Sequence, residues 1–156
     1  MRTEDHPAVN GQASASSLAH QFTAALAARD AAALRSLFGS EVDFRGLTPG
    51  RVWETRTADA LVNDVILGSW FEPSDVIQRI ESVQAGRVGT RIRIGYRLQV
   101  ENAGGTFSVE QQAFCDLTDG MIIWLRVLCS GFVPVAASDA RATADSRDAQ
   151  LKGKQS

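Results

Sequence analysis

The chain has 156 residues, the size of one ordinary domain, and it is 44% hydrophobic and 22% charged, as is typical of globular proteins. Its formal charge of −2 argues against nucleic acid as a partner, because nucleic-acid-binding proteins gather a basic excess on one face. No apolar run approaches the roughly 20 residues needed to span a bilayer, and the first residues are too polar for a signal peptide. We therefore expect no membrane association and a cytoplasmic location.

Both ends of the chain are expected to lie outside the folded domain. Residues 1–15 are small and polar, and residues 136–156 contain a single large aliphatic residue, Leu151. Neither segment can bury enough apolar surface to offset the entropy of folding. We therefore expect a disordered N-terminal segment, one folded domain over residues 16–135, and a flexible C-terminal tail.

The first part of the folded region is expected to be mainly helical. Apolar residues follow at helical spacing after a capping serine at position 16 or 17, and a second short helix is expected over residues 31–38. Alternating apolar and polar residues predict a half-buried strand over residues 42–46, followed by a short strand over 51–55. A third helix is expected over residues 57–70.

The second part of the folded region is expected to consist of long strands. Four β-rich runs separated by glycine-containing turns span residues 77–83, 89–100, 106–117 and 121–132. Helices first and strands afterwards indicate an α+β fold rather than alternating βαβ units. We expect a cone-shaped, curved antiparallel sheet with three N-terminal helices packed on its concave face, and an interior that binds a small apolar molecule.

This order of elements resembles the nuclear transport factor 2-like superfamily, and in particular its SnoaL-like and ketosteroid-isomerase branches. The residues that carry the likeness are Gln21–Asp30, Leu37-Phe38, Val42–Pro49 and Ala113–Arg126. This scaffold is used by isomerases, cyclases, epoxide hydrolases, dehydratases and binding domains, so the resemblance implies a fold more than an activity.

The isomerase residues of that superfamily correspond poorly to this chain. The resemblance places Phe22, which has no hydroxyl, at the position of the oxyanion-binding tyrosine on the first helix. The general base, an aspartate at the end of the first strand, corresponds to Gly46, or to Arg45 after a shift of one residue. The second oxyanion donor, a protonated aspartate on the penultimate strand, corresponds to Gln112. Steroid-type isomerisation by the family's own residues is therefore not expected.

A hairpin turn at Asp119-Gly120 determines which faces the last two long strands present. Regular pairing about this turn places Glu110 opposite Cys129 and makes Cys115 and Cys129 point to opposite faces. We therefore expect two free thiols rather than a disulfide. The face expected to line the interior carries Glu110, Gln112, Phe114, Asp116, Ile123, Leu125, Val127 and Cys129.

Glu110 is the strongest candidate for a catalytic residue, with Gln112 orienting an oxygen of the ligand. A carboxyl among apolar neighbours has a raised pKa, which suits it to acid or base chemistry near neutral pH. We expect no metal, because two cysteines and two histidines cannot supply a structural zinc site, and no cofactor, because no dinucleotide or phosphate-binding motif is present. The residues expected to bind the ligand are Phe22, Trp53, Tyr96, Phe114, Leu125 and Val127.

The register of the preceding hairpin decides whether Glu110 faces the interior. If the loop Asn102–Gly105 has four residues, Arg97 lies opposite Glu110 and the two form an ion pair on the outer face. If the hairpin carries a bulge, Tyr96 lies opposite Glu110 and both face inward. The sequence leaves both arrangements open.

Two functions are compatible with the sequence. The first is a small enzyme that performs cofactor-independent acid–base chemistry, as a cyclase, isomerase or dehydratase, on a lipophilic or polyketide-like substrate. The second is a non-catalytic ligand-binding or dimerisation domain of the same fold. Large apolar residues expected on the outer face predict a homodimer through that face, formed by Trp124, Ile122 and Leu128.

Overall fold

The computed structural model describes residues 7–135, and it describes side chains from residue 15 onward. The first helix, α1, runs over Pro7–Ala27, so it begins before the expected serine cap at position 16 or 17. The disordered segment expected over residues 1–15 includes residues 7–15, which lie in α1, whereas residues 1–6 and the expected flexible tail over residues 136–156 lie outside the described residues. No helix in the described part of the chain is both long and apolar enough to cross a bilayer.

Two further helical segments are short. Helix α2, Ala31–Arg35, is capped by Asp30, whose Oδ1 accepts from the Ala33 backbone N–H at 3.0 Å. Helix α3, Ala58–Ala60, is capped in the same way by the Thr57 hydroxyl and continues as a π-helix, η1, over Leu61–Trp70. The expected second and third helices are thus present, and the second ends earlier than expected because the following strand already begins at Phe38.

In the described part of the chain, seven strands form one sheet with the order β2-β1-β6-β5-β4-β3, and β7 pairs with β5. Strands β1 and β6 run parallel, so the sheet is mixed and not wholly antiparallel as expected. The α+β fold class is confirmed. The strands are β1 Phe38–Thr48, β2 Arg51–Thr57, β3 Val76–Val88, β4 Arg91–Asn102, β5 Gly105–Thr118, β6 Met121–Cys129 and β7 Val133–Pro134.

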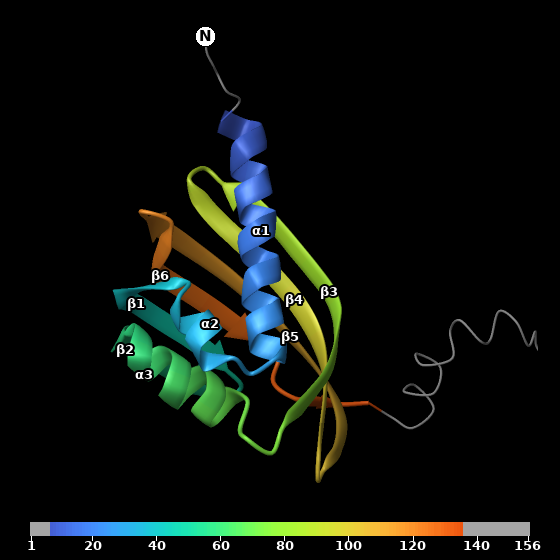
Figure 1. Cartoon of the computed structure of the whole chain (residues 1–156). Coiled ribbons are helices and arrows are strands. Elements are labelled where there is room, and N and C mark those ends of the chain that lie inside the picture. Colours follow the sequence, from blue (N-terminus) through green and yellow to red (C-terminus); the bar gives the residue numbers. More distant parts are fainter. Residues whose placement is uncertain (1–6, 136–156) are drawn as a thin grey trace, which may run out of the picture.

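The helices lie against one face of the curved sheet, which we call the inner face (Figure 1). Helix α1 packs across β3 and β4, and its Phe22 ring lies 5.8 Å from the ring of Tyr96 and 6.3 Å from that of Phe38. The core lies between these layers. The opposite, outer face of the sheet carries no described helix.

The two last hairpins differ in register, and this difference fixes the faces of β5. In the β4–β5 hairpin the pairing is regular, with Asn102 opposite Gly105 and Arg97 opposite Glu110. In the β5–β6 hairpin a bulge lies at Ile123, between the pairs Leu117–Ile122 and Asp116–Trp124.

The bulge corrects three expectations about side-chain orientation, because one extra residue reverses the alternation of a strand. Gln111, and not Glu110, lies opposite Cys129. Ile122 is fully buried in the core and does not lie on the outer face. Cys115 and Cys129 are both buried and both point to the inner face, and the prediction of two free thiols is confirmed.

Candidate functional site

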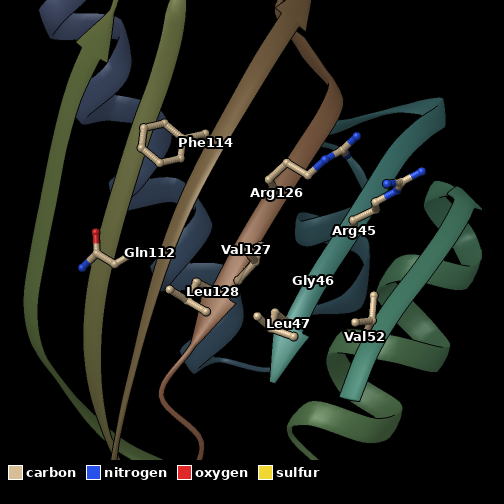
Figure 2. A pocket seen from close by; sticks show the side chains of 9 residues that line it. All are labelled: Arg45, Gly46, Leu47, Val52, Gln112, Phe114, Arg126, Val127 and Leu128. Atoms are coloured by element: carbon tan, nitrogen blue, oxygen red, sulfur yellow. The ribbon is translucent and has the colours of Figure 1, made fainter. Parts of the chain in front are cut away.

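Two hollows lie on opposite faces of the sheet. The inner cavity has a volume of about 170 Å³ and lies where β1 and β2, η1 and the C-terminal end of β6 meet. Its lining residues are Thr48, Trp53, Ser69, Trp70, Phe71, Gln111, Cys129, Gly131 and Phe132. The outer groove, of about 350 Å³, is larger and is lined by Arg45, Gly46, Leu47, Val52, Gln112, Phe114, Arg126, Val127 and Leu128 (Figure 2).

A buried amide forms one polar wall of the inner cavity. Gln111 is 1% exposed, and its Oε1 accepts a hydrogen bond from the Tyr96 hydroxyl. Burial, and secondarily the nearby Cys129, raise the pKa of Tyr96 well above its ordinary value, so the phenol stays neutral and keeps donating. In this arrangement Nε2 is the other end of the Gln111 amide, and that nitrogen has no hydrogen-bond partner.

A buried indole forms a second polar wall. Trp70 is 9% exposed, its ring lies 5.7 Å from Phe44 and 6.4 Å from Trp53, and its Nε1 has no hydrogen-bond partner. The indole of Trp53, by contrast, donates to the Thr48 hydroxyl at 2.8 Å. The residues that line the cavity are thus largely aromatic, and they include two, Gln111 and Trp70, whose side-chain nitrogen has no hydrogen-bond partner within the protein.

The π-helix and one glycine bring Trp70 to this position. In η1 the Phe71 N–H donates to the Ile66 carbonyl five residues back, the hydrogen bond that defines a π-helix. A Cβ at Gly46 would lie only 2.7 Å from Trp70 Cζ2, so the ring can occupy this place because residue 46 is glycine. Local π-helical segments often occur at functional sites.

The unpaired donors indicate what the cavity can bind. Leaving a buried donor unsatisfied costs about 1–3 kcal/mol, and an oxygen acceptor on a ligand would remove that penalty. Only one other unpaired buried atom occurs among the described side chains, Arg29 Nη1, and Arg29 does not line the inner cavity. Donors fixed in a dry site stabilise negative charge that develops on an oxygen atom.

The structure corrects the expected orientation of Glu110. Its Oε1 accepts from Arg97 Nη2 at 2.8 Å and from Arg97 Nε at 3.0 Å, and its Oε2 accepts from Gln112 Nε2 at 2.9 Å, all on the outer face. The inward orientation is wrong because the β4–β5 hairpin has no bulge, and the ion-pair alternative is confirmed. Arg97, and then Gln112, lower the pKa of Glu110, the opposite of the shift expected for an interior acid or base.

The other predicted ligand-binding residues are divided between the faces. Trp53 lines the inner cavity, whereas Phe22, Tyr96 and Leu125 are buried in the core and are not among its lining residues. Gln112 and Phe114 line the outer groove on the face turned away from the helices, and the buried Val127 contributes to its lining (Figure 2). Of the predicted residues, Trp53 and Tyr96 therefore lie on the inner face of the sheet, whereas Glu110, Gln112 and Phe114 lie on the outer face.

The expected dimer face also changes in composition. Trp124 lies on the outer face, but its ring is covered by the guanidinium groups of Arg91, at 3.7 Å, and Arg126, at 4.3 Å. Leu128 lies on the same face and is 57% exposed, as expected. Ile122 is removed from this face by the β6 bulge, and the exposed Leu47 and Val52 border it instead.

Comparison with known proteins was informative only at the level of structure. No family model matches the chain, and no curated protein matches it by sequence. A proposed isomerase from Bacillus subtilis matches with a TM-score of 0.65 at 12% identity, over 78% of this chain and 89% of that one. A proposed polyketide cyclase from Xanthomonas campestris matches with a TM-score of 0.56 at 20% identity, over 76% and 91% of the two chains.

A third structure, an LEH-like epoxide hydrolase from M. tuberculosis, matches with a TM-score of 0.57 at 13% identity, over 90% of this chain and 96% of that one. The chain has the nuclear transport factor 2-like fold. The resemblance predicted from the sequence is therefore confirmed for the fold. The sequence identities are too low to assign the activities of these neighbours to this chain.

Within the nuclear transport factor 2-like fold, the positions matched to the isomerase residues have other roles here. Phe22 packs in the core, and the space beside Gly46 is filled by Trp70. The amide of Gln112 lies over Gly95 on the outer face, and the interior amide of β5 is its neighbour, Gln111. On β5, the residue that corresponds to the family's aspartate therefore faces outward, and the residue before it faces the interior.

Three site residues, Gln111, Trp70 and Cys129, were not identified as ligand-binding or catalytic candidates from the sequence. The alternation of β5 marks Gln111 as interior only once the register is known. The spacing of buried residues in η1 gives no signal for the π-helix, because Ile66 and Trp70 lie four residues apart, as on one face of an α-helix. In the described part of the chain, no group of three His, Cys, Asp or Glu side chains could hold a metal ion.

Proposed function

We propose that the protein binds a small, largely apolar molecule in the inner cavity through an oxygen atom that accepts from Gln111 Nε2 and Trp70 Nε1, and acts on it without a cofactor. The observation that carries the proposal is that Gln111 and Trp70 both line one aromatic cavity and that each has a buried nitrogen donor without a partner. Both side chains are at least nine-tenths buried, so the surrounding protein holds them in place before a ligand arrives.

The volume of the cavity favours a ligand of about one six-membered ring. Its 170 Å³ is close to the roughly 150 Å³ of an engineered apolar cavity that holds benzene, and is below the range of about 300–1,000 Å³ usual for larger ligands. A multi-ring, polyketide-like molecule would have to extend through the mouth of the cavity.

The chemistry of the donors favours activation of a carbonyl group. Two N–H groups directed at one carbonyl oxygen stabilise the enolate or alkoxide form to which the carbonyl is converted, and removal of one such donor typically slows an enzyme by about 10²–10³. Stabilisation of charge on an oxygen atom is compatible with the activities named for the structural neighbours, an isomerase, an epoxide hydrolase and a polyketide cyclase.

A second candidate function is ligand binding without catalysis. The observation that favours it is that no carboxylate or histidine is among the residues that line the inner cavity. General acid–base catalysis would then depend on a group that is not a carboxylate.

A pair of probes that differ only in the oxygen tests the proposal. Cyclohexanone and methylenecyclohexane have nearly the same shape, and we expect the ketone to bind more tightly by calorimetry. Trp70→Phe, which keeps an aromatic ring but removes the N–H, should weaken ketone binding about tenfold, the equivalent of one hydrogen bond of 1.4 kcal/mol, and leave the hydrocarbon unaffected. The matched control, Trp124→Phe on the outer face, should change neither.

Equal affinity for the two probes, or equal losses in both tryptophan variants, would contradict the proposed site. Exchange of the ketone's α-protons with deuterated water, followed by NMR, then separates the two functions. Exchange faster than in buffer, and slowed in Trp70→Phe, supports catalysis, whereas binding without accelerated exchange supports the binding domain.

A further inference from the structure

Cys129 is the nucleophilic side chain of the inner cavity. It is the last residue of β6, it is 9% exposed, and it lines the cavity beside the turn that contains Gly131. The register places it directly opposite Gln111, and side chains paired in this way have Cβ atoms about 4.5–5.5 Å apart. The side chains of Gln111 and Cys129 therefore start from neighbouring positions of the sheet and line the same cavity.

Two features distinguish Cys129 from the other cysteine of the chain, its place in the cavity lining and a backbone donor at its sulfur. The Gly131 backbone N–H donates to Cys129 Sγ at 3.3 Å, a contact that strengthens as negative charge develops on the sulfur. Cys115 differs: it is fully buried, it does not line the inner cavity, and burial raises the pKa of its thiol to about 12. The protein thus carries a matched unreactive thiol.

The two cysteines lie too far apart to form a disulfide with each other. Cys115 pairs with Leu125 and Cys129 with Gln111, so the cysteines are separated by four residues along the sheet, or about 13 Å. A disulfide requires Cα atoms within about 7 Å. Cys129 is therefore available to a ligand.

We propose that the inner cavity binds α,β-unsaturated carbonyl compounds covalently, with the Cys129 thiol adding to the β-carbon while Gln111 and Trp70 hold the carbonyl oxygen. This rests on the proposed function and narrows its ligand class. The β-carbon of such a compound lies three bonds from the oxygen, which matches a sulfur and an amide on neighbouring strands. Trp70 and Gln111, nine-tenths buried or more with free donors, are independent of the cysteine and point to an oxygen-bearing ligand.

The addition is balanced without any co-reactant. The sulfur forms a bond to the β-carbon, the carbon–carbon π bond breaks, and its electron pair moves through the carbonyl to give an enolate oxygen. That oxygen is held by the two donors. The proton released by the thiol ends on the α-carbon, so the net change is addition of S–H across the double bond, and the reverse reaction restores both partners.

Three probes separate covalent reaction from simple binding. N-ethylmaleimide has the reactive double bond and carbonyl oxygens, N-ethylsuccinimide has the same ring without the double bond, and dimethyl disulfide exchanges with thiols but has no oxygen atom. We expect the maleimide to modify Cys129 at least tenfold faster than Cys115, measured by intact mass and peptide mapping. Cys129→Ser should abolish the rapid phase.

The donors are tested by the ratio of the two reaction rates. In Trp70→Phe and in Gln111→Leu, the rate with the maleimide should fall about tenfold relative to the rate with dimethyl disulfide, because only the maleimide has oxygen atoms that can accept from the donors. A loss shared equally by both reagents would show a change in access and overturn the proposal, as would equal maleimide rates at the two cysteines.

The succinimide distinguishes failure of this inference from failure of the proposed function. If it binds, as measured by calorimetry, and the maleimide does not add to Cys129, the covalent step is wrong and the binding site stands. If it does not bind and the maleimide still adds at a rate independent of Trp70 and Gln111, both the donor pair and the covalent proposal that uses it are contradicted.

Discussion

Polar side chains are paired with one another on the outer face of the sheet, whereas two of them are unpaired on the inner face. On the outer face, Arg97 pairs with Glu110, and similar ion pairs join Arg91 to Asp116, Arg126 to Asp43 and Arg45 to Glu54. On the inner face, charge is scarce and the donors of Gln111 and Trp70 have no partner. A carboxylate that is already paired has little left to offer a ligand, so unpaired donors locate the site better than acidic residues do.

The largest expected effect comes from filling the space that holds Trp70 in place. Gly46→Val places methyl groups where the indole lies, since even a Cβ would approach Trp70 Cζ2 to 2.7 Å. Overpacking of this kind costs about 1–3 kcal/mol. We expect a loss of unfolding free energy of about 3 kcal/mol in urea denaturation, together with loss of ketone binding. A variant of unchanged stability would show that the inner face is loosely packed.

A second expected effect appears at high pH, where the inner face contains groups that stay protonated. Burial raises the pKa of Cys115 from 9.0 to about 12 and raises the pKa of Tyr96 as well. Above pH 9 the unfolded chain releases protons that the folded chain keeps, so stability falls as pH rises, by up to about 1.4 kcal/mol per pH unit for each group.

Urea denaturation between pH 8 and pH 11 measures this slope. Cys115→Ala should make it shallower, and tyrosinate absorbance, which reports the single tyrosine, should appear only as the protein unfolds. Tyrosinate formed in the folded protein near pH 10 would contradict the burial of Tyr96.

The outer groove allows a test of self-association. We propose that a second copy of the chain covers it, because Leu47, Val52 and Leu128 remain exposed while the neighbouring charges are paired within the chain. Sedimentation should give twice the mass of one chain, and Leu128→Glu should reduce it to one, with ketone binding retained. A wild-type protein that sediments as a single chain contradicts the proposal.

The smallest expected effect is that of replacing Glu110. This variant tests most directly whether the outer face influences the inner site. Glu110→Gln removes a solvent-exposed ion pair with Arg97, so unfolding free energy should change by less than about 1 kcal/mol. Binding of cyclohexanone and the maleimide rate at Cys129 should stay within twofold of wild type. A large loss of either would connect the outer carboxylate to the inner site.

The layout of helices and strands could be predicted because the apolar spacing in most elements is regular. The face of Glu110 depended on one loop, and its pairing with Arg97 was one of the two arrangements that the loop allowed. The bulge at Ile123 could not be predicted, since residues 121–125 are apolar without interruption and give no alternation from which to assign a face. The unpaired state of Trp70 and Gln111 depends on tertiary packing.

The positions of the three tryptophans give the protein separate optical reporters for its two faces. Trp53 and Trp70 line the inner cavity, while Trp124 is enclosed between two guanidinium groups on the far side of the sheet. In Trp124→Phe the remaining emission therefore comes from the cavity alone. Entry of a molecule into this chain can then be followed by fluorescence without any added label.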